Sequence, residues 1–477
     1  MKVEKEVSLN HNTSPSKKDL GTDSLGVQKT MRLKHYLGDG STMIATNTIS
    51  GLVGMLTFFY TDKIGLAAGT VGTILLLSRI FDAFSDLVMG KLVDSTKSKH
   101  GKARPWILWM TLPTIIGIIL LFTIPANASM MTKNIYAFLT VTLVTGIIYT
   151  AIVIPYSSLM ALRTRSSEER GKMGITRAVF GYVIGMVIAI MLIPVSNMLG
   201  GDQRAWIIIG VVLGVISSIA LFITFITSKE ENTTASTEQA EAKVSFIESI
   251  KLLFKNKYFV IMLFVNFLMQ MMYTLNGSTG VYYTKYILGN ENLVGIMGGV
   301  GLIPVLVGFI AVGPMMKKFG LTKTVQIGFV IGIIATGLRC FMPYSFTAAL
   351  VLGSLATFAT IPMMSIGGVL FSNTIEYGEW KTGKRLVGMI NSASSFGMKI
   401  GMGLGAAIIG WILAFGSYDG TLAVQPESAI NSILLLTVYL PFALFLISYL
   451  ILRKFDLDKK YPQIVKELDE RRNSVTK

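Results

Sequence analysis

Three charged side chains interrupt an apolar segment near residue 80 that is otherwise typical of a membrane-spanning helix. Arg79, Asp82 and Asp86 lie between Thr70 and Val93. Each charge would cost about 2.5–3.5 kcal/mol near the middle of a bilayer. Because Asp82 and Asp86 are four residues apart, a helix presents both carboxylates on one face. Two acids kept at such a cost predict a cation-binding site.

The residue types leave the identity of this cation open. Ser85 lies between the two acids, and carboxylate and hydroxyl oxygens are the ligands that Na⁺ prefers. Asp82 and Asp86 could therefore bind Na⁺ as a metal ion, or they could bind and release H⁺ instead. Arg79, one turn earlier, offers a structural alternative, because it could neutralise Asp82 in a buried ion pair. One negative charge would still remain in excess.

Three further ionisable residues in apolar segments are candidates for substrate binding. Asp39 either caps a helix near the membrane surface or accepts hydrogen bonds from a substrate. Arg177 either extends its side chain to the membrane surface or faces the substrate. Lys399 lies about twelve residues into its segment, where a lone lysine needs an acidic partner or a ligand. An acid on a facing helix is the obvious partner, and a structural ion pair is the alternative role.

Aromatic side chains could complete a site for a sugar, because sugars bind to polar groups and to aromatic faces. Tyr149 is the predicted substrate contact of this type. The wider set of candidates in or near apolar segments is Tyr149, Tyr156, Tyr273, Tyr282 and Tyr283.

Two charged residues near predicted helix ends are candidates for a gate or latch. Asp94 lies eight residues beyond Asp86, which is about 12 Å along a helix axis and therefore close to the membrane surface. Arg104 lies in the basic loop that follows. Charges at such positions can hold the ends of neighbouring helices together.

The composition requires a bilayer around these residues. The chain has 477 residues, of which 52% are hydrophobic and 15% charged, whereas soluble domains carry roughly 25% charged residues. We predict an all-α membrane protein with twelve spans. They lie near residues 36–61, 68–93, 104–124, 134–161, 174–198, 205–227, 258–286, 293–316, 322–341, 347–372, 387–415 and 429–452.

The positive charge of the chain predicts its orientation rather than a nucleic-acid partner. The net charge is +16, and Lys and Arg gather in the N-terminal tail, in alternate loops and after Arg453. This asymmetry places both termini in the cytoplasm. No basic stripe is interleaved with stacking aromatic residues, so nucleic-acid binding is not expected.

The spans fall into two groups of six, separated by a polar stretch. This is the organisation of transporters built from two pseudo-equivalent bundles. The predicted divisions are a disordered cytoplasmic tail at 1–31, an N-terminal bundle at 32–228, a cytoplasmic linker with an amphipathic helix at 229–257, a C-terminal bundle at 258–455 and a cytoplasmic tail at 456–477.

Several segments in this order resemble a known family. They are Phe58–Asp62, Val71–Gly72, Arg79–Asp86, Gly90–Asp94, Thr96–Trp106, Ile154–Tyr156, Tyr282–Tyr286 and Glu376–Lys381. Over residues 32–455 the chain resembles the glycoside–pentoside–hexuronide:cation symporters, the melibiose-permease branch of the major facilitator superfamily. The resemblance implies the major facilitator fold, with twelve transmembrane helices in two six-helix bundles.

The resemblance also implies roles for individual residues. The family's cation site corresponds to Asp82, Ser85, Asp86 and Thr150, and its charged sugar-site residues correspond to Asp39, Arg177 and Lys399. Two positions depart from the melibiose pattern. A sugar-binding aspartate is replaced by Val153, and a stacking tryptophan by Ser157. Because valine cannot accept a hydrogen bond, another glycoside, a pentoside or a hexuronide is at least as good a candidate substrate as a galactoside.

We therefore predict a secondary active transporter in the plasma membrane that couples sugar movement to Na⁺ or H⁺ by alternating access. The alternative within transport is a related carrier of a non-sugar amphipathic or lipid substrate. A membrane enzyme is not expected, because His11, His35 and His100 lie in the tail or at membrane edges and form no nucleophile–base pair. The predicted partners are the sugar, the cation and the bilayer; no cofactor is expected, and the transporter is predicted to act as a monomer.

Overall fold

The computed structural model describes residues 21–22, 28–164, 166–230, 246–384 and 386–475. These residues are mostly helical and contain no strand, so the all-α prediction is confirmed. The α-helices are α1 (Leu33–Gly40), α2 (Thr42–Gly54), α3 (Leu56–Phe58), α4 (Ala68–Ser95), α5 (Arg104–Trp109), α6 (Thr111–Phe122), α7 (Met130–Thr142), α8 (Thr150–Arg163), α9 (Ser167–Met198), α10 (Gln203–Thr227), α11 (Phe246–Lys255), α12 (Lys257–Tyr286), α13 (Leu293–Val300), α14 (Leu302–Phe319), α15 (Leu321–Cys340), α16 (Phe346–Thr382), α17 (Val387–Phe415), α18 (Glu427–Leu434), α19 (Leu440–Leu452) and α20 (Leu457–Val475).

Three π-helical segments join some of these helices into longer rods. They are η1 (Phe59–Lys63), η2 (Leu143–Tyr149) and η3 (Leu435–Tyr439). Such segments widen the helix locally and are frequent at functional sites. The segment η2 ends directly before Thr150, one of the predicted cation ligands.

Most of the helices have the length and composition of membrane spans. Within the described residues, nine helices are long and apolar enough to cross a membrane, and a tenth is obtained if the pair 33–54 and 56–63, bent by 42°, counts as one span. The helix α4 and the broken pair α5–α6 are outside that count. The predicted number of twelve spans therefore remains a prediction.

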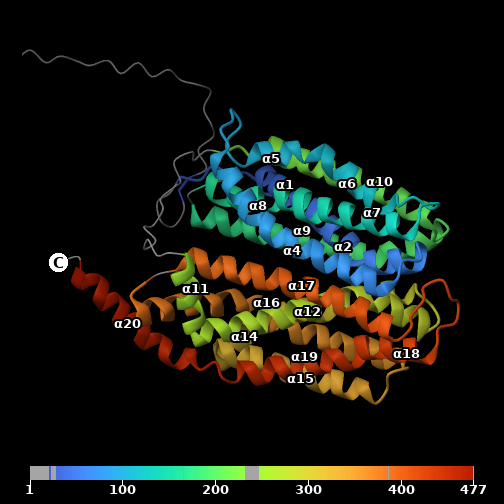
Figure 1. Ribbon diagram of the computed structural model, residues 1–477. Helices are drawn as coiled ribbons and strands as arrows, with labels where there is room; N and C mark the ends of the chain where they lie inside the picture. Colours follow the sequence, from blue (N-terminus) through green and yellow to red (C-terminus); the bar gives the residue numbers. More distant parts are fainter. Residues whose placement is uncertain (1–20, 23–27, 165, 231–245, 385, 476–477) are drawn as a thin grey trace, which may run out of the picture.

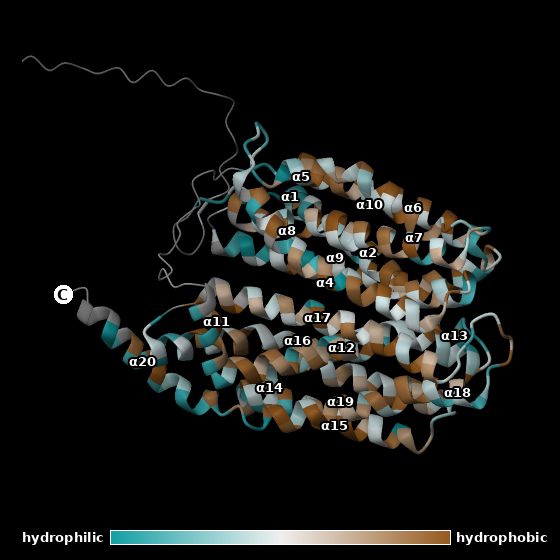
Figure 2. Ribbon diagram, viewed as in Figure 1, coloured by the Kyte–Doolittle hydropathy of each residue, from teal (hydrophilic) through white to brown (hydrophobic). Residues whose placement is uncertain are grey.

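The helices gather into two bundles that lie side by side (Figure 1). Helices α1–α10 form the first bundle, in which α10 packs on α6 and α2 on α9. Helices α11–α20 belong to the second, in which α15 packs on α16 and α12 on α17. Hydrophobic residues cover most of the helical surface, and hydrophilic residues concentrate toward the two ends (Figure 2). Large apolar side chains such as Leu306 and Ile310 of α14 are exposed, as expected for a surface in contact with lipid.

The described ends of the chain define one face of the molecule, which we call the tail face. The start of α1, the end of α10, the helix α11 and the C-terminal helix α20 all lie there (Figure 1). The loops before α4, before α13 and before α18 lie at the other end, which we call the opposite face. Most of the predicted N-terminal tail and residues 231–245 of the predicted linker lie outside the described residues; α11 occupies the place of the predicted amphipathic helix.

Two carboxylates hold the described ends of these segments on the first bundle. Glu169 accepts hydrogen bonds from the backbone N–H groups of Thr30 and Met31, at 2.9 and 2.7 Å. Glu230 accepts three from residues 102–104, at 2.8 to 2.9 Å. Gly101 passes close beside Glu230 with a φ of +101°, where a side chain would collide with the carboxylate. The chain is thus fastened to the first bundle at the start of the predicted linker.

Small residues allow the two bundles to meet closely along α4 and α17. A Cβ atom on Gly410 would lie 2.3 Å from the Ala68 carbonyl oxygen and 2.7 Å from the Gly72 Cα atom. A Cβ atom on Gly403 would lie 2.8 Å from the Arg79 Cβ atom. Glycine at these positions therefore permits backbone contact, as is common between membrane helices.

A second seam joins α9 to α13 on the same half of the molecule. A Cβ atom on Gly295 would lie 2.5 Å from the Ile190 carbonyl oxygen. Near the opposite face, the Asn197 side-chain amide donates to Asn292 Oδ1 at 2.9 Å. The described contacts between the bundles thus run from the opposite face to the middle of the molecule.

Candidate cation and substrate site

The predicted cation ligands meet in the middle of the molecule. The Thr150 hydroxyl oxygen lies 2.9 Å from Asp82 Oδ1 and 3.1 Å from Asp86 Oδ1. The Ser85 hydroxyl lies 3.4 Å from the Thr150 hydroxyl and donates to the Asp82 carbonyl oxygen at 3.0 Å. Two carboxylates and two hydroxyl groups therefore form one oxygen-rich cluster.

Lys399 of the second bundle inserts its ammonium group into this cluster. Its Nζ atom lies 2.7 Å from Asp82 Oδ1, 3.2 Å from the Asp82 carbonyl oxygen and 2.5 Å from Asp86 Oδ2. The Asp82 side chain has no exposed surface, and those of Asp86 and Lys399 are 18% and 15% exposed. Lys399 is thus a cation, supplied by the chain itself, bound between the two acids.

Arg79 makes a weaker contact with the same cluster. Its Nη1 atom lies 3.4 Å from Asp82 Oδ2, and its side chain is 20% exposed. The ion pair between Arg79 and Asp82 that the sequence offered as an alternative is therefore present, but only as a long contact. Lys399 makes the short contacts with both acids. Two carboxylates and two cationic side chains give the cluster no net formal charge.

The local fold brings the two helices of the first bundle close enough to form the cluster. The segment η2 crosses α4 at Gly146, where a Cβ atom would lie 2.6 Å from the Phe81 ring and 3.6 Å from the Asp82 Cα atom. Glycine therefore lets η2 approach α4 at the level of Asp82. Thr150 follows one turn later and presents its hydroxyl to both acids.

Among the described residues there is no group of three or more His, Cys, Asp or Glu side chains that could hold a metal ion. The cluster contains two acids and two hydroxyls instead. This donor set lacks the nitrogen and sulfur ligands typical of transition metals and suits a hard monovalent cation or a proton.

Asp39 and Arg177 form a separate pair, closer to the tail face. Arg177 Nε lies 2.7 Å from Asp39 Oδ2, and Nη2 lies 2.9 Å from Oδ1, which is the two-pronged geometry of a strong ion pair. The Asp39 side chain has no exposed surface. The Tyr156 ring packs 3.8 Å from the guanidinium carbon, and its hydroxyl donates to the Asp39 carbonyl oxygen at 2.8 Å.

Tyr149 ends η2, and the two positions that depart from the melibiose pattern, Val153 and Ser157, follow on α8 at intervals of four residues, so the three share one helix face. Tyr149 is half-buried, and its hydroxyl accepts a hydrogen bond from Ser50 at 3.4 Å. Ser157 is exposed and donates to the Ile154 carbonyl oxygen at 2.7 Å. Tyr149 is also the neighbour of Thr150 in the sequence, so its backbone adjoins the cation cluster.

The predicted gate residues do not form a described link between the bundles. Arg104 donates to the Phe225 carbonyl oxygen at 2.7 and 3.2 Å, and its guanidinium group packs 4.7 Å from the Phe225 ring. Both residues belong to the first bundle, where Arg104 caps the end of α10. The side chain of Asp94 lies outside the described residues.

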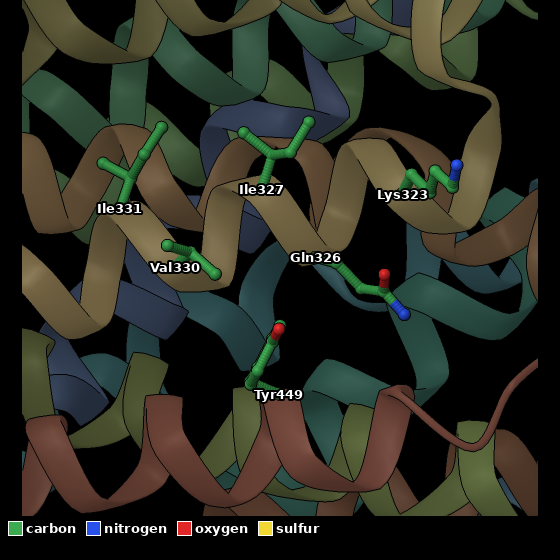
Figure 3. Close-up of a pocket in the computed structure, with 6 residues that line it drawn as sticks. All are labelled: Lys323, Gln326, Ile327, Val330, Ile331 and Tyr449. Carbon is green, nitrogen blue, oxygen red and sulfur yellow. The ribbon is translucent and has the colours of Figure 1, made fainter.

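A surface groove of about 320 Å³ lies elsewhere, between α15 and α19 (Figure 3). It is lined by Lys323, Gln326, Ile327, Val330, Ile331 and Tyr449. None of these is a predicted site residue, and all lie in the second bundle.

A cluster around Asp62 on the opposite face was not predicted from the sequence. Asp62 is bonded to Lys285 across the two bundles at 2.6 Å. The available signal was an acid in the segment Phe58–Asp62 and a lysine in Tyr282–Tyr286, but charges at the ends of apolar segments are ordinary.

Comparisons with known proteins agree with one another. The family described as MFS/sugar transport protein matches residues 38–459. An isoprimeverose transporter of Lactiplantibacillus pentosus is 29% identical over 98% of this chain and 97% of its own. The inner membrane symporter YicJ of Escherichia coli is 31% identical over 89% of this chain and 92% of its own. A glucuronide carrier protein homolog of Escherichia coli is 30% identical over 87% of this chain and 91% of its own.

Solved structures with low sequence identity share the fold. A bacterial homolog of the human lysosomal transporter Spinster, in an inward-facing and unoccupied conformation, has a TM-score of 0.64 at 13% identity and covers 89% of this chain and 99% of its own. A bacterial homologue of the iron transporter ferroportin, also inward-facing, has a TM-score of 0.60 at 14% identity and covers 90% of this chain and 99% of its own.

Proposed function

The chain belongs to the family of glycoside–pentoside–hexuronide:cation symporters of the major facilitator superfamily, and on this premise we propose which residues bind its cation and its sugar. The predicted major facilitator fold is confirmed, and the protein is a transporter rather than an enzyme. It couples the movement of a sugar to that of a cation. The identity of the cation and the roles of the residues are the proposal.

The proposed cation site consists of Asp82, Asp86, Ser85 and Thr150, and Lys399 occupies it when no coupling ion is bound. The observation that supports this proposal is the position of the Lys399 ammonium, 2.7 and 2.5 Å from the two carboxylates. A coupling cation beside Lys399 and Arg79 would bring three positive charges to two carboxylates, and this excess charge is costly in a poorly hydrated site. Na⁺ or H⁺ therefore binds by displacing Lys399.

The displaced lysine couples the cation site to the sugar site. Once released from the acids, Lys399 is free to donate hydrogen bonds to sugar hydroxyls, or to a carboxylate in a hexuronide. Sugar bound in this way keeps Lys399 away from Asp82 and Asp86. By thermodynamic linkage, the cation must raise the affinity for sugar by the same factor as the sugar raises the affinity for the cation.

The proposed sugar site lies between the bundles and includes Tyr149, Lys399 and the Asp39–Arg177 pair. In the structure that pair is internally satisfied, so a sugar must share or replace its hydrogen bonds. The names of two relatives, an isoprimeverose transporter and a glucuronide carrier homolog, make a glycoside or a hexuronide the first substrates to test. Val153 and Ser157 argue against the galactoside pattern.

The orientation follows from the distribution of positive charge. Among the described residues, the Lys and Arg residues at 97–104, 163–164, 166–172, 381–384 and 453–475 all lie on the tail face, which we therefore assign to the cytoplasm. The transporter is then closed toward the outside. We propose that twelve spans in the plasma membrane work as a monomer, and that the two bundles rock about the central site.

The proposal is tested by sugar uptake into vesicles containing the purified transporter. Isoprimeverose and a glucuronide serve as probes, with an imposed Na⁺ gradient or H⁺ gradient. Asp86→Asn should abolish gradient-driven accumulation, because one of the two ligands loses its charge. Lys399→Gln should bind the cation more tightly but lose accumulation, because its competing ammonium and its link to the sugar are both removed.

The control is Lys323→Gln, which removes a lysine of the surface groove between α15 and α19 (Figure 3) and should transport normally. Undiminished accumulation in Asp86→Asn would refute the cation assignment. Weaker cation binding in Lys399→Gln would refute the proposed competition.

A further inference from the structure

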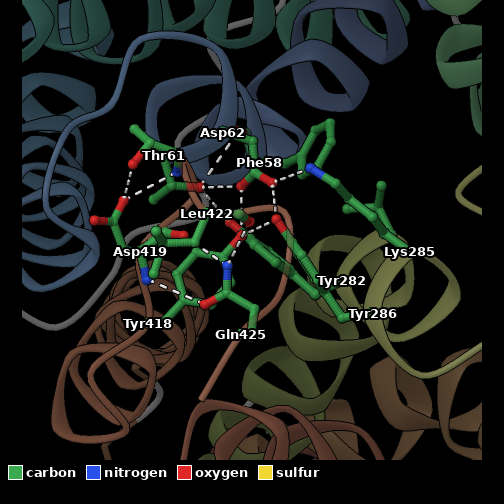
Figure 4. Close-up of polar contacts among 12 residues, drawn as sticks. Phe58, Thr61, Asp62, Tyr282, Lys285, Tyr286, Tyr418, Asp419, Leu422 and Gln425 are labelled. Atoms are coloured by element: carbon green, nitrogen blue, oxygen red, sulfur yellow. Dashed lines mark hydrogen bonds and ion pairs between the residues drawn. The ribbon is translucent and has the colours of Figure 1, made fainter. Parts of the chain in front are cut away.

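A dense polar cluster joins the bundles at the opposite face (Figure 4). Asp62 of η1 is at its centre. Its Oδ1 atom lies 2.6 Å from Lys285 Nζ and accepts a hydrogen bond from the Tyr286 hydroxyl at 2.8 Å. Its Oδ2 atom accepts from the Tyr418 hydroxyl at 2.7 Å. All three donors belong to the second bundle.

The carboxylate of Asp62 depends on these donors. Its side chain has no exposed surface, and that of Lys285 is 29% exposed. The one further described contact within the first bundle comes from the neighbouring Thr61 hydroxyl, at 2.7 Å. A buried carboxylate is costly unless it is paired and hydrogen-bonded. Asp62 is therefore stable in this position only while the second bundle is in contact with it.

Aromatic rings seal the space around the ion pair. The Tyr282 ring meets the rings of Phe58 and Tyr418 edge to face, at centroid distances of 5.7 and 5.4 Å. The Tyr282 hydroxyl lies 2.9 Å from that of Thr61. These rings exclude water from Asp62, and a drier site strengthens the attraction between Asp62 and Lys285.

The loop between α17 and α18 closes over the cluster. Gln425 folds this loop by hydrogen bonds to the backbone of Asp419, at 2.6 and 3.2 Å. Gly420 then passes so close to η1 that a Cβ atom would lie 2.5 Å from the Thr61 carbonyl oxygen. The loop thereby presents Tyr418 to Asp62 (Figure 4).

We propose that Asp62, with Lys285, Tyr286 and Tyr418, is the latch that holds the transporter closed on its opposite face. The first bundle supplies the acceptor and the second supplies the donors, so separation of the bundles on this face breaks all three contacts together. Asp62 is buried and paired in the closed state and hydrated in the open one. The strength of the latch therefore sets how often the transporter opens on this side.

This inference rests on alternating access by a two-bundle transporter and not on the identity of the sugar or cation. It can be tested without a substrate, by measuring the accessibility of a cysteine behind the latch. Ser50 suits this purpose, because its exposed side chain contacts Tyr149 at the central site. One turn further toward the opposite face, the Gly54 carbonyl oxygen accepts a hydrogen bond from Ser278 of the second bundle, at 2.7 Å.

The test uses Ser50→Cys in a Cys340→Ser background, since Cys340 is the only cysteine of the chain. A membrane-impermeant maleimide is added to right-side-out vesicles, which expose the opposite face in the proposed orientation. We expect Asp62→Asn and Lys285→Met each to raise the labelling rate about tenfold, because each removes a charge-assisted hydrogen bond of the closed state. The double variant should exceed either single variant only slightly, because both remove one shared interaction.

Two matched controls are available in the same region. Asp419→Asn removes an exposed acid whose carboxylate bonds only to Thr421 among the described residues. Lys63→Met removes a lysine that, like Lys285, lies 5.3 Å from the Phe58 ring but makes no described ion pair. Neither should change the labelling rate.

Thermal melting of each purified variant separates a latch from a purely structural pair. A folded Asp62→Asn protein with an unchanged labelling rate would overturn the proposal. Equal acceleration by the two controls would overturn it as well. If Asp62→Asn does not fold, Lys285→Met decides, because it leaves Asp62 with its three hydroxyl donors. A working latch alongside undiminished accumulation in Asp86→Asn would refute the cation assignment alone, and an unchanged labelling rate in Asp62→Asn alongside an inactive Asp86→Asn would refute the latch alone.

Discussion

At the scale of single residues, the buried charged side chains form ion pairs with charged side chains on other helices. Lys399 is held between Asp82 and Asp86, Arg177 grips Asp39 with two hydrogen bonds, and Lys285 binds Asp62. The pairs at Lys399 and Lys285 cross the two bundles, whereas Asp39–Arg177 lies within the first. A pair that joins the two bundles must break if the bundles separate at that point. The Asp39–Arg177 pair can stay intact, because both of its residues belong to the first bundle.

Thr150 provides a direct test of the cation cluster, because its hydroxyl lies within 3.1 Å of both acids. Thr150→Val keeps the shape but removes the ligand oxygen. We expect the cation concentration for half-maximal sugar uptake to rise about tenfold, whereas Thr150→Ser should stay within about threefold of the original. The measurement is sugar uptake as a function of Na⁺ and of pH.

The control for Thr150 is Thr145→Val, which removes a buried hydroxyl that bonds only to the Val141 carbonyl oxygen among the described residues. Its cation dependence should be unchanged. A normal cation dependence in Thr150→Val would remove Thr150 from the site.

The Asp39–Arg177 pair separates stability from substrate binding. Arg177→Gln leaves a buried carboxylate without its cation, which costs about 3–5 kcal/mol. The melting temperature in detergent should therefore fall strongly. Adding Asp39→Asn removes the unpaired charge and should recover most of that stability.

Sugar uptake by this double variant decides the role of the pair. If Asp39 and Arg177 bind the sugar, the stabilised double variant stays inactive. Recovered uptake would show that the pair serves the fold alone.

At the scale of helices, glycine controls how closely α4 and α17 approach. The backbones touch at Gly72 and Gly410 near the opposite face, and Gly403 lies against Arg79, which itself contacts Asp82 of the cation cluster. The register of this seam places Lys399 of α17 opposite Asp82 and Asp86 of α4. The same seam therefore closes the opposite face and positions the lysine.

Gly410→Ala tests this coupling between packing and conformation. The added Cβ atom would lie 2.3 Å from the Ala68 carbonyl oxygen, so the seam cannot close without a backbone shift. We expect the opposite face to open more often, as measured by faster maleimide labelling of Ser50→Cys. Gly353→Ala is the control, because its Cβ atom would meet nothing within 4 Å; a similar change in both variants would contradict the prediction.

At the scale of the whole molecule, two bundles meet along seams that run from the opposite face to the middle. The α4–α17 and α9–α13 seams and the Asp62 cluster all lie on this half, and the cation cluster marks its inner end. An alternating-access cycle must separate these contacts in order to open the central site to the opposite face. In the proposed rocking motion, the central pair Lys399–Asp86 lies near the pivot of the two bundles.

A reversible cross-link across the second seam tests this requirement. Asn197 and Asn292 face each other at 2.9 Å, so Asn197→Cys and Asn292→Cys in the Cys340→Ser background should react with a short cleavable bis-thiol reagent. We expect uptake of sugar to stop on cross-linking and to return on reduction. Each single variant treated in the same way should retain uptake. Continued uptake by the cross-linked double variant would show that transport does not require the α9–α13 seam to open.

The sequence determined the class of the protein and most of its intramembrane charges. Apolar segments long enough to span a bilayer require helices, because a helix satisfies its own backbone hydrogen bonds in lipid. The cost of a charge in that setting is enough to single out Asp39, Asp82, Asp86, Arg177 and Lys399. The spacing of four residues is enough to place Asp82 and Asp86 on one face.

The tertiary structure decided which charges pair and which side of the transporter is closed. Lys399 is 317 residues from Asp82, and Lys285 is 223 residues from Asp62, so neither partner can be assigned from local periodicity. Asp62 lies at the end of an apolar segment, where an exposed acid is inexpensive, and only the packing of the second bundle buries it. Electrostatic pairing depends on distance and on the exclusion of water, and both are properties of the assembled bundles rather than of any one segment.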